Sequence, residues 1–360
     1  MIRILVLNNY SICRVLIEYE KEKKPSHHLY GIVELKKMGY SIIISDPNNR
    51  SFLYKFSNIL RRIPLFYVGN LQQQFEAILS YKNYDLVYAP CQDTTIFLGV
   101  LSYFKLFRKP IIALAHHPML RGQLANFRKY SLFFSINGHY QFLSLSKIVE
   151  TQLNYIAKKD ISQEMFWGPD LNYYNKVNTE IQKPIKIYDI ISVGRTGRDY
   201  HTLIKAFNNT SIKVCIYCSD ELKKLLPPFY TDNITIKWLQ SQEALDYIEL
   251  IGMYLSAKIL AIPMHDEDSL CGLTSLTDSI ALGMPTIITR NKYINIDPEL
   301  NHFGIWVDAY DVNAWKAAAD KILNDTNLFE AMSKNAKQIA STTFNINLFS
   351  SSLIKIIDNN

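Results

Sequence analysis

Short apolar runs alternate with longer amphipathic stretches along most of the chain. In the first half, β-branched runs end at turn or polar residues, which predicts strands at Ile2–Leu7, Ser41–Ser45, Asp85–Ala89 and Ile111–Ala115. Helical patterns separate them, including His28–Met38, which stops at Gly39, and Thr95–Phe107, which stops before Pro110. This βαβ order predicts a parallel sheet covered by helices on both faces.

A second series of the same kind begins near Tyr188. Its expected strands are Asp189–Val193, Lys213–Tyr217, Ile234–Trp238, Ile259–Ile262 and Thr286–Thr289, with helices such as Tyr200–Phe207 and Leu276–Leu282 between them. The polar, Asn-rich stretch 171–186 contains Pro184 and predicts the boundary between the two series. We therefore expect two Rossmann-like, doubly wound α/β domains at residues 1–172 and 185–340, facing across a cleft. A helix at 341–360 could pack back on the first domain.

Composition agrees with two globular domains. The chain has 360 residues, of which 48% are hydrophobic and 20% charged. Five widely spaced cysteines argue against a disulfide scaffold and indicate a reducing compartment. Cys215 and Cys218 form a C-x-x-C, but their apolar surroundings favour buried strand cysteines over a zinc site. No uninterrupted apolar stretch reaches the ~20 residues of a membrane-spanning helix.

Positive charge is concentrated in the first half of the chain. Residues 1–180 hold 22 basic and 13 acidic residues, whereas residues 181–360 hold 17 and 20. Such a field favours an anionic partner: nucleic acid, a phosphorylated substrate or an anionic membrane surface. The stretch 51–68 places Phe52, Phe56, Ile59, Leu60 and Ile63 on one helical stripe beside Lys55, Arg61 and Arg62. This pattern fits an ordinary core helix with a basic edge or a helix lying in a membrane interface.

The segment from Gly272 to Thr289 carries the strongest chemical signal. Gly272 permits close approach of the backbone to a ligand, and Thr274 or Ser275 can cap the helix that follows. Amide groups near Leu273 at that helix start favour a phosphate. Asp278 lies about one turn in, where its carboxylate could accept hydrogen bonds from a ribose diol; a capped helix with a solvated Asp is the simpler interpretation.

A second segment runs from a strand into Gly194, which we expect to contact the substrate, and then into a polar loop and another helix. Arg195 and Arg198 lie in that loop, and arginine is suited to bidentate phosphate binding. Two surface arginines paired with Asp199 are the simpler interpretation. Neither segment contains GxGxxG or GxxxxGK[ST], which disfavours dinucleotide-dependent oxidoreductases and P-loop NTPases.

Together these residues resemble the GT-B nucleotide-sugar glycosyltransferases, in particular the retaining glycosyltransferase family 4 (group 1). The resemblance covers about 185–295 and rests on Ser192-Val-Gly-Arg with Arg198, and on Asp278-Ser-Ile-Ala-Leu-Gly-Met-Pro. It implies that Arg195 and Arg198 hold the donor pyrophosphate and that Asp278 binds the ribose. The strand after Lys109-Pro resembles the one that delivers a catalytic His into the cleft, which favours His116 over His117.

The chain departs from the family at the acidic pair. The family places a second glutamate upstream, near the position of Leu270, whereas this chain has Asp266, Glu267 and Asp268. Of these we expect Asp268 to bind substrate. The run beginning at His265 could suggest a metal site, but its ligands are packed in sequence and the resemblance implies metal independence. His27 and His28 could contact an acceptor, although polar residues at a helix start are the simpler interpretation.

The resemblance implies a hexosyltransferase that moves a sugar from a nucleotide diphosphate-sugar to a glycan or lipid-diphosphate-linked acceptor. It further implies retention, no cofactor or metal, and a role in bacterial surface polysaccharide synthesis in the cytoplasm, at the inner face of the cell membrane. A nucleotide-sugar epimerase and a catalytically silent GT-B binding subunit remain alternatives. Nucleic acid is not an expected partner, because no nucleic-acid-binding module is present.

Overall fold

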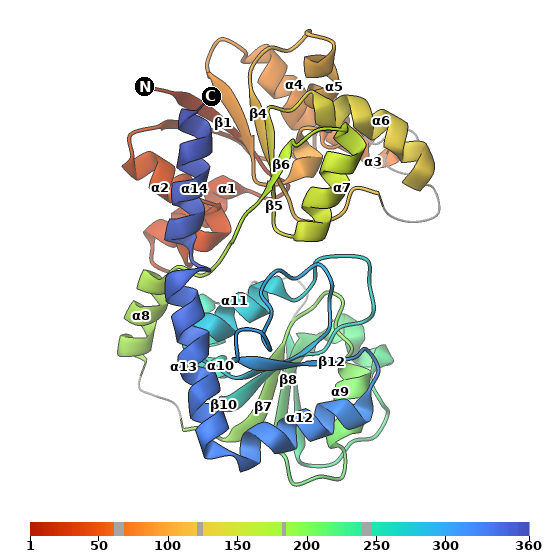
Figure 1. Ribbon diagram of the computed structural model, residues 1–360, viewed down its shortest axis with the longest axis vertical. Coiled ribbons are helices and arrows are strands. Elements are labelled where there is room, and N and C mark those ends of the chain that lie inside the picture. The colour runs from red at the N-terminus through yellow and green to blue at the C-terminus, as the bar shows by residue number, and fades with distance from the viewer. Residues whose placement is uncertain (61–67, 121–124, 182–184, 240–245, 360) are drawn as a thin grey trace. The chain divides into compact units, whose positions relative to one another are not determined.

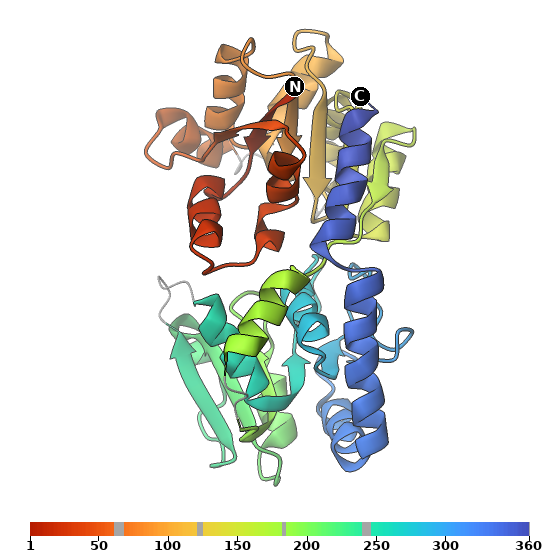
Figure 2. The ribbon, with the colours of Figure 1, turned by 90° about the vertical axis from the view of Figure 1, so that its left-hand side faces the viewer.

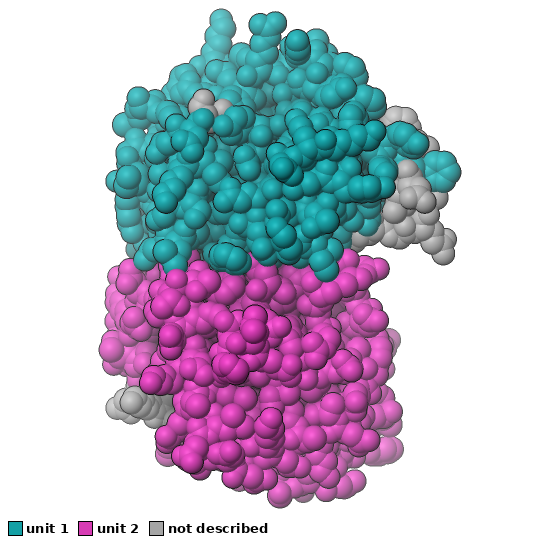
Figure 3. Space-filling view, viewed as in Figure 1, with its two compact units in different colours: residues 1–21, 26–167, 346–360 teal, residues 22–25, 168–345 magenta. Residues whose placement is uncertain are grey.

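The chain forms two α/β units, described here from a computed structural model (Figure 1). The structure describes residues 1–60, 68–120, 125–181, 185–239 and 246–359. Unit 1 comprises 1–21, 26–167 and 346–360, and unit 2 comprises 22–25 and 168–345 (Figure 3). The division falls between Trp167 and Gly168, ahead of the polar stretch in which the sequence predicted it.

Unit 1 contains one six-stranded parallel sheet among its described residues, in the order β2-β1-β3-β4-β5-β6. Four of these strands were predicted from apolar runs. The sequence interpretation missed β5 and β6, which are short and begin or end with polar residues. The strands are β1 (Arg3–Leu7), β2 (Ser41–Ser45), β3 (Leu86–Ala89), β4 (Ile111–Ala115), β5 (Gln141–Ser144) and β6 (Ser162–Glu164).

The helices of unit 1 connect these strands, and a further helix, α14, comes from the C-terminal end of the chain. They are α1 (Ile12–Glu20), α2 (Ile32–Lys37), α3 (Phe52–Leu60), α4 (Leu71–Leu79), α5 (Ile96–Tyr103), α6 (Ala125–Asn137), α7 (Lys147–Ala157) and α14 (Ile346–Asp358), with 3-10 turns at Ser26–Leu29 and Gln92–Thr94. Figures 1 and 2 show α14 beside α2, and the two helices are in contact. The helix predicted at 28–38 is interrupted at Tyr30 and Gly31, which have φ of 47° and 84°.

The predicted amphipathic helix at 51–68 forms only in part within the described residues. Helix α3 ends at Leu60, and 61–67 lie outside the described part of the chain. Phe52, Phe56 and Ile59 of the predicted stripe are exposed, while Ser57 is the buried residue of the helix. An ordinary core helix would bury that stripe, so the structure does not support the core interpretation for α3.

Unit 2 contains a second six-stranded parallel sheet in the order β12-β11-β10-β7-β8-β9. Five of its strands match predicted runs, and β12, which starts at a glycine, was missed. The strands are β7 (Tyr188–Val193), β8 (Val214–Ser219), β9 (Ile234–Leu239), β10 (Ala257–Ile262), β11 (Thr286–Thr289) and β12 (Gly304–Val307). Cys215 and Cys218 are buried in β8, as the sequence interpretation favoured.

The helices of unit 2 cover both faces of this sheet, as expected for a doubly wound fold. They are α8 (Leu171–Glu180), α9 (Tyr200–Phe207), α10 (Tyr247–Leu255), α11 (Leu273–Leu282), α12 (Val312–Asn324) and α13 (Thr326–Thr342), with a 3-10 turn at Asp220–Leu225. Helix α8 occupies most of the predicted linker. It forms because Asp170 accepts a hydrogen bond from the Tyr173 amide and because Tyr174 and Val177 bury one face.

Candidate active site

The loop between β7 and α9 lies against the segment that follows β10. The His265 amide donates to the Gly197 carbonyl at 3.1 Å, and the Asp199 amide donates to Pro263 at 3.2 Å. Arg198 and Met264 form an isolated antiparallel bridge. Since β7 and β10 are neighbouring parallel strands, their carboxyl ends bring these two loops to the same edge of the sheet.

Arg198 connects this loop to the start of α11. Its Nη2 donates to the Ser275 hydroxyl at 2.9 Å. Its Nε is buried and has no hydrogen-bond partner. A buried guanidinium N–H without a partner costs free energy unless a ligand accepts from it. The arrangement therefore suits an anion that would lie against Arg198.

Gly194 makes room for this guanidinium. A Cβ atom built on Gly194 would lie 2.4 Å from Arg198 Nε and 2.9 Å from its Cζ. Any side chain at position 194 would therefore displace the arginine head group. Gly194 therefore helps to position Arg198, and the substrate contact expected of Gly194 stays a prediction.

Replacement of Gly194 by alanine is expected to weaken nucleotide binding. The new methyl group must push the Arg198 guanidinium away from Ser275, which removes a charge-assisted contact of about 1.5–3 kcal/mol. Affinity for a nucleoside diphosphate should fall roughly tenfold to a hundredfold in calorimetry. Gly252→Ala is a matched control, because nothing lies within 4 Å of a Cβ at that glycine. Equal affinity in the two variants would contradict the positioning role.

The start of α11 differs from the prediction in its cap. Gly272 is the N-cap, with φ of 84° and no side-chain hydrogen bond, so Thr274 and Ser275 lie within the first turn and do not cap the helix. Leu273 and Ser275 are buried, whereas Thr274 is exposed. Because glycine supplies no capping acceptor, the first-turn amides can serve an anionic ligand.

Asp278 does not lie where a ribose could reach it. The residue is 2% exposed, and its carboxylate accepts hydrogen bonds from the hydroxyls of three tyrosines. Tyr174 and Tyr247 donate to Oδ1, the latter at 2.9 Å, and Tyr254 donates to Oδ2 at 3.2 Å. The ribose-binding role predicted for Asp278 is corrected: both carboxylate oxygens are engaged by tyrosines of α8 and α10. We call Asp278 and these tyrosines the tyrosine cage.

The tyrosine cage adjoins the Arg198 contact. Burial raises the pKa of Asp278 to about 6, while the three phenolic hydrogen bonds act in the opposite direction. Burial also raises the pKa of Tyr254 well above its usual range, and Tyr254 in turn interacts with Ser275, the acceptor for Arg198. The cage therefore supports the helix turn that holds Arg198.

The remaining predicted residues are distributed around this centre. Arg195 is exposed on the β7–α9 loop, and Arg198 of the same loop contacts Ser275 of α11. Asp268 is exposed on the β10–α11 loop and pairs with Lys292 at 2.8 Å. That hydrogen bond lowers the pKa of Asp268. The predicted substrate contact of Asp268 would have to compete with this ion pair.

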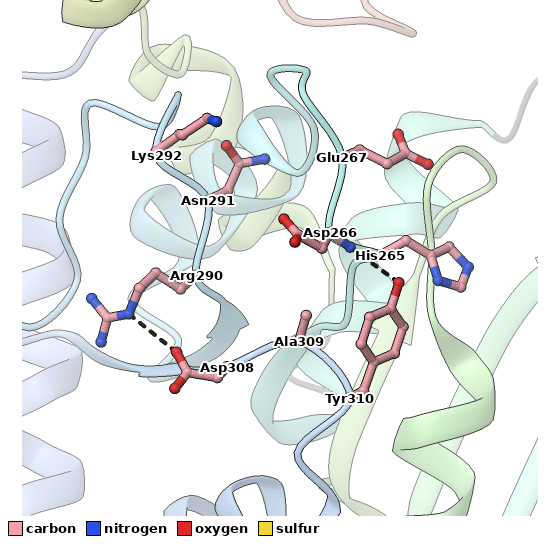
Figure 4. A pocket seen from close by; sticks show the side chains of 9 residues that line it. All are labelled: His265, Asp266, Glu267, Arg290, Asn291, Lys292, Asp308, Ala309 and Tyr310. Carbon is pink, nitrogen blue, oxygen red and sulfur yellow. Dashed lines mark hydrogen bonds and ion pairs between the residues drawn. The ribbon is translucent and has the colours of Figure 1, made fainter.

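A pocket of ≈ 420 Å³ opens beside these loops (Figure 4). Its walls come from the segments that follow β10, β11 and β12, so it lies at the carboxyl edge of the sheet. Arg290 pairs with Asp308 at 3.4 Å, and the Tyr310 hydroxyl accepts from the Asp266 amide at 3.4 Å. The sequence interpretation missed most of this lining, which consists of His265, Asp266, Glu267, Arg290, Asn291, Lys292, Asp308, Ala309 and Tyr310.

These polar groups can bind a hydroxyl-rich ligand. Negatively charged carboxylates, a positively charged guanidinium and a neutral amide border the pocket. Such a set can both donate hydrogen bonds to sugar hydroxyls and accept hydrogen bonds from them. Within the described residues, no three His, Cys, Asp or Glu side chains gather as ligands for a metal ion.

His116 belongs to unit 1 and follows β4, as predicted. Its Nε2 lies 2.6 Å from the Pro90 carbonyl oxygen, and its amide donates to Gln92 Oε1 at 3.1 Å. Burial lowers its pKa, so the ring is neutral near pH 7. Because a carbonyl only accepts, Nε2 carries the proton and Nδ1 is the accepting nitrogen. The ring packs edge-on against Tyr30, at 5.3 Å between centroids.

His27 and His28 lie in the 3-10 turn Ser26–Leu29 of unit 1. His27 is buried, and its burial lowers its pKa well below the usual value. Trp167 Nε1 donates to the His27 carbonyl at 3.0 Å. His27 is therefore a buried part of this turn, which packs against Trp167.

Comparison with known proteins supports the expected enzyme class. Residues 177–339 match the model of the family "Glycosyl transferases group 1". A curated D-inositol 3-phosphate glycosyltransferase of Corynebacterium jeikeium (strain K411) is 33% identical over 93 residues, which are 26% of this chain. The chain covers 22% of that relative's length. The family match and this relative support a glycosyltransferase, in agreement with the sequence interpretation.

Solved structures show the fold over the whole chain. Trehalose 6-phosphate synthase of Burkholderia multivorans matches with a TM-score of 0.71 at 10% identity, covering 100% of this chain and 99% of its own. Sucrose-phosphate synthase of Thermosynechococcus elongatus matches with 0.69 at 14% identity and the same coverage. Anabaena HepE, solved with UDP and glucose, matches with 0.65 at 13% identity over 100% of both chains. Two parallel six-stranded sheets and these neighbours confirm the predicted two-domain α/β GT-B fold.

Proposed function

We propose that the protein transfers a sugar from a nucleotide diphosphate-sugar, whose diphosphate binds at Arg198 and the start of α11. The single observation that carries the proposal is the Arg198 guanidinium, which meets Ser275 at 2.9 Å while its buried Nε lacks a partner. A diphosphate oxygen would accept from Nε and from the first-turn amides of α11. The similarity to Anabaena HepE, solved with UDP-glucose, supports a nucleotide-sugar donor.

Catalysis would come mainly from electrostatic stabilisation of the leaving diphosphate. Negative charge develops on the leaving oxygen as the sugar departs, and a partly buried guanidinium stabilises it more strongly than water does. The sugar would occupy the adjoining pocket between Glu267 and Tyr310. We propose transfer with retention and without a metal ion or cofactor, with the diphosphate oxygen taking the acceptor proton. Arg195 would add positive charge at the open side of the loop.

The acceptor would be a glycan or a lipid-diphosphate-linked glycan bound by unit 1, in bacterial surface polysaccharide synthesis. Unit 1 holds most of the basic half of the chain, which favours an anionic acceptor. His116, neutral near pH 7 and protonated on Nε2, would accept at Nδ1 and orient an acceptor or sugar hydroxyl. Within the described residues, no helix is long and apolar enough to cross a membrane. We propose action in the cytoplasm at the inner face of the membrane.

A catalytically silent GT-B binding subunit is the second candidate. The tyrosines of the cage hydrogen-bond the Asp278 carboxylate. Near the position where the family has its second glutamate, this chain has Leu270, which is 8% exposed. A chain with neither carboxylate at the donor could bind a nucleotide without turning it over.

A panel of UDP-sugars and GDP-sugars tests the proposal and separates it from its alternatives. We expect nucleotide release that increases when a lipid-diphosphate-linked glycan is added. Sugar interconversion without release would indicate an epimerase. Saturable nucleotide binding without either reaction would indicate a silent subunit and would contradict sugar transfer.

A further inference from the structure

Helices α5 and α6 of unit 1 present a group of exposed apolar side chains. The two helices pack against each other, and the residues cluster at the end of α5 and along α6. We call this group the aromatic patch. It consists of Tyr103 (39% exposed), Phe104 (57%), Leu106 (75%), Phe127 (62%), Tyr130 (78%) and Phe134 (37%).

Ring contacts join three members of the aromatic patch. Phe134 lies 5.1 Å from Tyr103 and 5.7 Å from Phe104, measured between ring centroids. Phe127, Tyr130 and Phe134 are spaced three and four residues apart, so they lie on one face of α6. Soluble proteins rarely leave an apolar surface of this kind in water unless it contacts a partner.

The charge around the aromatic patch selects among partners. The segments 96–109 and 125–137, which hold both helices and the patch residues, contain no Asp or Glu and five basic residues: Lys105, Arg108, Lys109, Arg128 and Lys129. Lys105 and Arg108 are exposed beside Phe104 and Leu106 in the chain. Two copies of such a surface would repel each other, so a symmetric dimer through the patch is disfavoured.

We propose that the aromatic patch docks the protein on an anionic lipid bilayer. Tyrosine rings favour the boundary between lipid headgroups and acyl chains, because the ring is buried while the hydroxyl stays in water. The phenylalanine and leucine side chains add apolar area that the acyl region can bury. Adjacent Lys and Arg side chains are attracted to anionic headgroups. The combination gives both terms that interfacial binding needs, apolar burial and electrostatic attraction. That docking would bring the enzyme to its acceptor rests on the proposed function, in which a lipid-linked acceptor lies in the same bilayer.

Sedimentation with lipid vesicles tests this docking surface. The full chain should bind vesicles of phosphatidylcholine with phosphatidylglycerol, bind pure phosphatidylcholine weakly, and dissociate as salt is raised. The double variant Phe104→Ser/Tyr130→Ser should lose at least about tenfold in partitioning, because burial of two aromatic rings is lost. Arg108→Glu should lose roughly fivefold or more. Phe229→Ser is the matched control, since Phe229 is 85% exposed in unit 2.

Several outcomes would overturn the docking proposal. They are absent binding to the anionic vesicles, equal binding by the folded patch variants, or loss confined to Phe52→Ser in α3. A change of oligomeric state in the patch variants, measured by light scattering without lipid, would instead indicate a second copy as the partner. Turnover with a water-soluble acceptor, measured without vesicles, tests sugar transfer independently of membrane docking. Lost turnover with intact vesicle binding would reject sugar transfer alone.

Discussion

Arg198→Ala is expected to lower kcat/KM for nucleotide-sugar turnover by about 10²–10³-fold, the usual effect of removing one donor that stabilises a developing anion. The variant loses the contact to Ser275 and the buried Nε that would serve the diphosphate. Nucleoside diphosphate affinity should also fall, but by less than kcat/KM, because charge on the diphosphate increases as the sugar leaves. Steady-state kinetics and calorimetry measure the two effects separately.

Two further variants show whether the geometry of the guanidinium matters. Arg198→Lys keeps the charge but loses the planar set of donors, so its activity should lie between that of the wild type and the alanine variant. Arg50→Ala removes an exposed arginine of unit 1 and should leave kcat/KM unchanged. Full activity of folded Arg198→Ala would contradict the diphosphate site and, with it, the proposed mechanism.

The sequence predicted the sheets well because strand formation depends mainly on local apolar runs. Runs such as Ile111–Ala115 are buried at every position, as expected for a parallel sheet covered on both faces. Strand β6, Ser162–Glu164, has no apolar residue, and its pairing with β5 decides its conformation. The prediction of a linker at 171–186 was wrong over α8 for a related reason. The sequence of α8 is polar, but its tyrosines pack against distant residues of unit 2, and this packing stabilises the helix.

The candidate site was predictable where topology alone brings residues together. Arg198 and Ser275 are 77 residues apart, but each follows a strand at the same edge of the sheet. Asp278 was misassigned because its environment depends on distant residues. Tyr174 lies 104 positions away and Tyr247 lies 31 away. Local spacing places Asp278 on α11 but does not indicate that three phenols surround it.

Stability measurements on Asp278 should show the opposite pH dependence from an ordinary ion-paired carboxylate. Burial raises its pKa from 3.8 to about 6 in the folded protein. Between these values the unfolded chain releases the proton first, so the free energy of unfolding contributed by Asp278 falls as the pH rises. The contribution is fully present below about pH 4 and is lost above about pH 6. At 1.36 kcal/mol per pKa unit, the change is about 3 kcal/mol.

Asp278→Asn removes this titration while keeping the size and one accepting oxygen of the side chain. We therefore expect the difference in unfolding free energy between variant and wild type to shift by about 2–3 kcal/mol in favour of the variant from pH 4 to pH 7. Hydrogen exchange of the α11 amides in urea reports this for unit 2 alone. Asp232→Asn, at an exposed carboxylate of the same unit, should show no comparable shift.

The same variant decides between the tyrosine cage and a ribose contact. An asparagine in the cage can still accept from Tyr174 and Tyr247 at Oδ1 and can donate from Nδ2 to the Tyr254 hydroxyl, so nucleotide affinity at pH 7 should stay within about threefold of the wild-type value. Asp278→Ala leaves three buried hydroxyls without their acceptor and should destabilise unit 2 by about 2–4 kcal/mol near pH 4, where the folded wild type keeps this carboxyl protonated, and by less at pH 7. A large loss of nucleotide affinity in stably folded Asp278→Asn would restore the ribose role, because only a ligand contact would depend on the charge of that carboxylate.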